Sequence, residues 1–143
     1  MAMINLELAR RLKQAALPWR PAERDCFVIP DRQLDDQIFV VNHLTTQIQN
    51  YHGDLMVTFH GTSEWALDDV LLAEVVWLPS ETQLREAIAE RIGPDAPLRL
   101  ERTSTGYRCQ LADSERMLEF DADGAEDAYA LALLALLQTH RQQ

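Results

Sequence analysis

The stretch Pro79–Pro94, PSETQLREAIAERIGP, carries the clearest secondary-structure signal in the chain. Ser80 followed by Gln83 three positions later is the pattern of a capping box, in which each side chain accepts the other residue's backbone N–H. Apolar residues at helical spacing follow, and a Gly-Pro pair ends the pattern: Leu84, Ile88, Ile92, Gly93 and Pro94. The stretch therefore predicts an amphipathic helix over residues 80–92.

Three alternating segments follow this helix. PLRLER, GYRCQL and RMLEF alternate apolar and polar residues and are joined by short polar links. This pattern is typical of a three-stranded antiparallel meander. We expect one buried face made of Leu98, Leu100, Tyr107, Cys109, Leu111, Leu118 and Phe120.

A second strong helical signal closes the chain, over residues 124–140. Asp123 is predicted as its N-cap, with Glu126 in its first turn. Apolar residues cover almost its whole circumference, so the helix must be covered on more than one side. It either lies between the sheet and a first helix, or forms part of a homodimer interface.

The N-terminal half predicts a first helix at about 4–17 and strands at CFVIP, at residues 37–44 and at residues 74–79. Between them, TTQIQNYHGDLMVTFH reads as a β-hairpin with Gly53 and Asp54 in the loop. That loop would place Ile48 opposite Phe59 and His60 opposite Gln47. The prediction is a single α+β domain, 1–143, whose antiparallel sheet (hairpin plus meander) is packed by about three helices.

Composition excludes several classes of function. The net charge is −10 and the single lysine is Lys13, which disfavours nucleic-acid partners and anionic membrane surfaces. The helix, three strands, helix order echoes double-stranded-RNA-binding domains, but the last helix begins with DADGAED where those domains present lysines. A basic protein partner is the more plausible one.

The chain is also predicted to be cytoplasmic. The N-terminus lacks a secretory signal, and the longest apolar run, Ala128–Leu137, is too short for a bilayer. Cys26 and Cys109 lie in apolar strand-like segments and are predicted to be reduced, buried and unreactive thiols.

Candidate site residues concentrate in two acidic segments. In HGTSEWALDDV (60–70), the residues Glu64, Asp68 and Asp69 could bind a hard metal ion or act as acid and base, and Asp35 and Asp36 could join them if folding brought the segments together. The simpler interpretation is a turn with solvated carboxylates, with Trp65 and Trp77 as structural anchors. We therefore predict no catalytic residue, no bound metal and no cofactor.

Established catalytic motifs are absent from the sequence, which has no GxSxG, GxGxxG, P-loop or HExxH pattern. The predicted function is a non-enzymatic protein-interaction or ligand-binding module. Two alternatives remain open: a metal-dependent hydrolase that uses the carboxylates, and an acidic nucleic-acid mimic that binds a basic partner.

The segments FVIPDRQLDDQIFV, GTSEWALDD, VVWLPSETQLREAI and EDAYALALLALL resemble a family of small bacterial proteins of unknown biochemical role. Some members of that family are labelled pilus assembly protein. WLPSETQL and the late Ala/Leu helix are also similar to short phage-encoded hypothetical proteins. Since the chain has no GxxxxGK[ST] sequence, the resemblance implies no catalytic residues.

Overall fold

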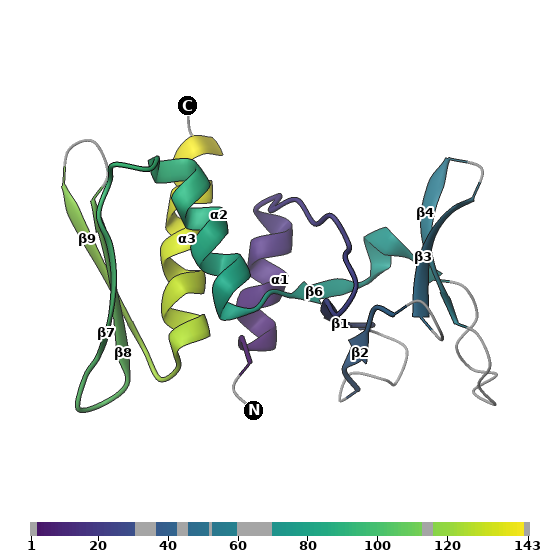
Figure 1. Cartoon of the computed structure of the whole chain (residues 1–143), viewed down its shortest axis with the longest axis horizontal. Helices are drawn as coiled ribbons and strands as arrows, with labels where there is room; N and C mark the ends of the chain where they lie inside the picture. The colour runs from purple at the N-terminus through teal and green to yellow at the C-terminus, as the bar shows by residue number, and fades with distance from the viewer. Residues whose placement is uncertain are drawn as a thin grey trace. The chain divides into compact units, whose positions relative to one another are not determined.

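The structure, a computed structural model, describes residues 3–30, 37–42, 46–51, 53–59, 70–112 and 116–141. The protein belongs to the α+β class: within these ranges it forms three α-helices and three antiparallel sheets of three strands each (Figure 1). Its contacts divide it into two compact units. Unit 1 comprises Met1–Leu17 and Pro79–Gln143, and unit 2 comprises Pro18–Leu78. The predicted α+β class is confirmed. The prediction of a single domain concerns cooperative unfolding and stays a prediction.

Helix α1 (Leu6–Gln14) is shorter than the predicted 4–17 because both of its ends are capped. The side chain of Asn5 accepts hydrogen bonds from the first free backbone N–H groups of the helix. At the other end Ala16 adopts a φ of 67°, and two backbone hydrogen bonds of the Schellman type close the last turn. The chain therefore leaves the helix before it reaches Pro18.

Helix α2 (Glu81–Ile92) forms as predicted, with its capping box complete. The N–H of Gln83 donates to Ser80 Oγ at 3.2 Å, and the N–H of Ser80 donates to Gln83 Oε1 at 2.9 Å. Leu84 and Ile88 are fully buried and hold the helix in unit 1.

The predicted meander is also present. It consists of β7 (Leu98–Arg102), β8 (Tyr107–Ala112) and β9 (Met117–Ala122), in the order β7-β8-β9. The register aligns Leu100, Cys109 and Phe120 in one row across the sheet. Along the predicted face, Cys109 and Leu111 are completely buried and the other members are half-buried. The predicted face is confirmed.

Helix α3 (Ala125–Arg141) runs along this sheet and packs against β8, β9, α1 and α2 (Figure 1). It begins after Gly124, one residue later than the cap predicted at Asp123. Its first turn is tied to the start of α1 by the N–H of Asn5, which donates to Asp127 Oδ1 at 2.7 Å. Its buried apolar residues are Ala125, Ala128, Tyr129, Ala130, Ala132, Leu133, Leu134, Leu136 and Leu137. The helix is thus covered on several sides within unit 1.

Unit 2 contains the other two sheets. The first has the order β2-β1-β6 and the second the order β3-β4-β5, followed by a 3-10 turn at Leu72–Glu74. The strands are β1 (Cys26–Val28), β2 (Phe39–Val40), β3 (Thr46–Tyr51), β4 (Asp54–Phe59), β5 (Val70–Leu71) and β6 (Val76–Leu78). The hairpin and the meander therefore belong to separate sheets, and not to one sheet as predicted.

The hairpin register also differs from the prediction. Tyr51 pairs with Asp54, so only two residues separate the strands, and Gly53 supplies the positive φ of 91° that the turn needs. Ile48 therefore lies opposite Val57 and not opposite Phe59. The predicted loop was one position late, so the register moved by two residues and each strand kept the same face. The partner predicted for Gln47, His60, lies outside the described residues.

The core of unit 2 combines residues from both of its sheets. Its buried members are Phe27, Ile29, Val41, Val57 and Val75, and Trp19, Phe39 and Ile48 pack against them. The apolar strand residues of the N-terminal half therefore have a core of their own.

Candidate functional site

The acidic candidates cannot be assembled into a site from the described structure. Asp35, Asp36, Glu64, Asp68 and Asp69 all lie outside the described residues, as does the predicted anchor Trp65. The convergence of the two acidic segments therefore stays a prediction.

The described ranges contain no group of three or more His, Cys, Asp or Glu side chains placed to hold a metal ion. None of the described helices is long and apolar enough to cross a bilayer.

Trp77, the other predicted anchor, belongs to an aromatic cluster on the sheet β2-β1-β6. It lies opposite Phe27 in the strand register, and its ring stacks on Trp19 with a centroid distance of 6.0 Å and an interplanar angle of 8°. Phe27 in turn stacks on Phe39 at 5.6 Å. The Nε1 atom of Trp77 is buried and has no hydrogen-bond partner among the described atoms. These contacts give Trp77 a packing role in unit 2.

Asp25 is a buried carboxylate that the sequence analysis did not single out. It is 6% exposed, and its Oδ2 accepts hydrogen bonds from Trp19 Nε1 and from the N–H of Ala22, each at 3.0 Å. The carboxylate closes the turn before β1 and fixes the indole that stacks on Trp77. A Trp and an Asp flank the proline-bounded segment PWRPAERD (18–25), and this pattern is the signal that the sequence offers for the turn.

The two cysteines are free thiols in different surroundings. Cys109 is fully buried, and burial raises its pKa to about 11. Cys26 is half-buried, so the prediction that it is a buried core thiol is wrong; it shares a face of β1 with the buried Val28 and lies on the other face from Phe27. Burial, and then the neighbouring Asp25 carboxylate, raise the pKa of Cys26 as well. Neither thiol has the lowered pKa that a nucleophilic cysteine requires.

These surroundings predict an ordered reaction with a thiol reagent. In the native protein Cys26 should react first and Cys109 should react only after unfolding, and both rates should rise with pH because thiolate is the reactive form. Since folding raises the pKa of Cys109, its contribution to stability is present below the unfolded-state pKa and should be lost as pH rises towards 11. Labelling with a chromogenic disulfide, with Cys26→Ala as control, measures this order. Equal labelling rates of the two thiols in the native protein would contradict this order. Recovery of fewer than two thiols after denaturation without reductant would contradict the prediction that both cysteines are reduced.

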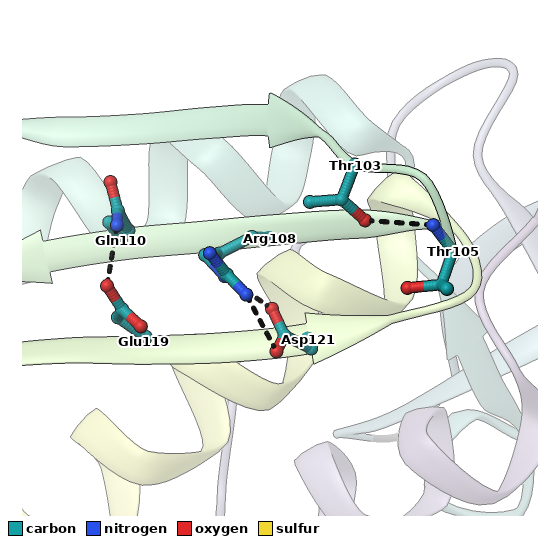
Figure 2. Close-up of polar contacts among 6 residues, drawn as sticks. All are labelled: Thr103, Thr105, Arg108, Gln110, Glu119 and Asp121. Atoms are coloured by element: carbon teal, nitrogen blue, oxygen red, sulfur yellow. Dashed lines mark hydrogen bonds and ion pairs between the residues drawn. The ribbon is translucent and has the colours of Figure 1, made fainter.

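The face of the meander opposite α3 is polar. Arg108 Nε donates to Asp121 Oδ1 at 2.8 Å, and Gln110 Nε2 donates to Glu119 Oε1 at 2.6 Å (Figure 2). The hydrogen bond and charge of Arg108 lower the pKa of Asp121. Both partners of the ion pair are well exposed, so it adds little stability. These pairs link the neighbouring strands β8 and β9, and they do not create a reactive group.

Comparisons with protein-family models, curated proteins and solved structures found no match to this chain. Functional conclusions therefore depend on the chain's own charge, burial and geometry.

Proposed function

We propose that the chain is a non-enzymatic protein-interaction module whose unit 2 binds a basic protein partner. The observation that carries the proposal is the unequal distribution of charge between the units. Pro18–Leu78 contains 10 acidic and 3 basic side chains, net −7, and the rest of the chain contains 13 and 10, net −3, which together give the −10 of the whole chain. A unit with this excess of acidic over basic residues attracts positively charged partners and repels nucleic acid.

Exposed apolar side chains also favour unit 2 as the part of the chain that binds the partner. Val40 lies in the edge strand β2 and is 42% exposed, and Ile38 directly precedes the strand and is 49% exposed. The two side chains lie on the same face, while Phe39 between them packs on the core. Apolar contacts stabilise a complex after charge attraction has brought the partners together. The partner we propose therefore combines basic residues with an apolar contact.

We further propose a cytoplasmic location, supported by the two free cysteines, since disulfides are rare in that compartment. The resemblance to small bacterial and phage proteins also stays a proposal. Nothing in the described residues favours the metal-dependent hydrolase. The nucleic-acid mimic is a special case of binding a basic partner, and competition by DNA distinguishes it.

The test is capture of proteins on the immobilised full chain at low salt, followed by measurement of Kd for the captured partner. We expect a basic protein whose Kd rises with salt, because screening weakens exposed charge pairs. The double variant Ile38→Ser/Val40→Ser should weaken binding at least about tenfold through lost apolar contact. Met117→Ser, at the most exposed large apolar residue described in unit 1, is the matched control and should leave Kd unchanged.

Three results would contradict the proposal: no basic protein retained at low salt, binding that is insensitive to salt, or equal effects of the two variants. If duplex DNA displaces the chain from the partner, the partner is a nucleic-acid-binding protein and the chain is a mimic of its ligand.

A further inference from the structure

We propose that two copies of this chain associate through the outer edge of β7, joining their meanders into one continuous antiparallel sheet. β7 is an outer strand of the order β7-β8-β9, and it has no strand partner on its other side within the described residues (Figure 2). This surface lies in unit 1 and is independent of the partner proposed for unit 2.

The backbone of β7 is oriented for such pairing. The N–H of Thr103 donates to the carbonyl of Gly106, and this bond continues the β7–β8 ladder. Because hydrogen-bonded pairs alternate along an antiparallel ladder, the N–H and C=O groups of Leu98, Leu100 and Arg102 point away from β8. Three alternate residues therefore present donors and acceptors at the edge.

The side chains of β7 are self-complementary in one register. A two-fold axis at Leu100 places Arg99 opposite Glu101 of the second copy, and Glu101 opposite its Arg99. Arg99 and Glu101 are both exposed and lie on the polar face of the sheet. Moving the axis to Arg99 or to Glu101 would place two like charges opposite each other, which is unfavourable. Charges that ordinarily discourage edge pairing therefore select this register.

The apolar face supplies a second reason. α3 packs on β8 and β9, and Cys109 and Leu111 beneath it are completely buried. Leu98 and Leu100 lie on the same face at the β7 edge but stay half-buried. In the proposed register Leu100 faces Leu100 of the second copy, so association covers part of this remaining apolar surface.

Neither of the other candidate dimer surfaces has these properties. The outer edge at β9 carries Glu119 and Asp121 on its polar face, and self-pairing about Glu119 would oppose two carboxylates. On α3, most of the apolar residues that suggested a homodimer interface in the sequence are buried inside unit 1, and Leu131 and Ala135 are half-buried.

A charge-swap series on the full chain tests the proposal by sedimentation over a range of concentrations. The wild type should show a reversible monomer–dimer equilibrium. Arg99→Glu and Glu101→Arg alone should each weaken it at least about tenfold, because each turns two attractive pairs into repulsive ones. The double variant restores opposite charges in the same register and should return to within about threefold of the wild-type Kd. Glu90→Arg, an equal charge change at an exposed position of α2, should have no effect.

Circular dichroism should confirm that every variant is folded, since the changed side chains are exposed. The proposal is overturned by a wild type that stays monomeric, by a dimer insensitive to the single reversals, or by a double variant that is not restored.

Discussion

Truncation of Phe27 to alanine is expected to lower the free energy of unfolding of unit 2 by about 3–5 kcal/mol, the usual cost of removing a buried aromatic ring. Phe27 has no exposed surface, and its ring contacts Trp19 and Phe39 at centroid distances of 6.0 and 5.6 Å. The loss of the ring leaves a cavity in the middle strand of the sheet β2-β1-β6. Urea denaturation followed by tryptophan fluorescence measures the effect.

This probe is selective because all three tryptophans of the chain, Trp19, Trp65 and Trp77, belong to unit 2. Val40→Ala is the matched control: it truncates a side chain of the same sheet that is 42% exposed, and it should cost less than about 1 kcal/mol. Equal midpoints for the two variants would show that Phe27 is not a core residue.

The Phe27→Ala variant also tests the prediction that residues 1–143 form a single domain. The three described α-helices all belong to unit 1, so circular dichroism at helical wavelengths reports mainly on that unit. If 1–143 is one cooperative domain, the fluorescence and dichroism transitions of Phe27→Ala must shift together. A shift confined to fluorescence would show that the two units unfold as separate domains.

The sequence predicted the fold of unit 1 well because its signals are local. The capping box at Ser80 and Gln83, and the alternation from Leu98 to Phe120, are satisfied by residues close in sequence, and the structure reproduces both. Both errors at helix ends have local causes as well. At the end of α1, Ala16 adopts the left-handed conformation that glycine usually occupies, so the sequence does not mark this helix end. At the start of α3, Gly124 precedes the helix at the place where a side-chain cap was expected.

Unit 2 was harder to predict because its strands are short and their partners are distant in sequence. β1 pairs with β6, whose residues lie about fifty positions further along the chain, and alternation within three residues cannot indicate such a partner. The stacking of Trp19 on Trp77 joins residues that lie far apart in the sequence, which makes it a tertiary feature as well. The acidic candidate site depends on residues outside the described ranges, so the sequence remains the basis for it.

Replacement of Leu134 by glutamate is expected to unfold unit 1. Leu134 is 3% exposed in α3, and a carboxylate buried there without a partner costs several kcal/mol, a large part of the stability of a small domain. Burial raises the pKa of the introduced carboxyl, and the neutral form costs less to bury. The loss should therefore be greatest at neutral pH and smaller in mildly acidic buffer. Helical circular dichroism measures it, with Gln138→Glu as control: that position is exposed one turn further along α3 and should tolerate the same charge.

The mass of the Leu134→Glu variant distinguishes the two roles that the sequence left open for α3. Loss of helical signal supports burial within one chain, where α1 and α2 pack against the helix in addition to the sheet. A folded monomer formed from a wild-type dimer would instead make α3 the interface, and the β7 pairing would then fail its own charge-swap test. A folded variant with unchanged stability and mass would mean that Leu134 faces solvent, which the apolar circumference of α3 and its burial both contradict. Because β7 and α3 lie on different parts of unit 1, light scattering on both sets of variants assigns the dimer surface to one of them.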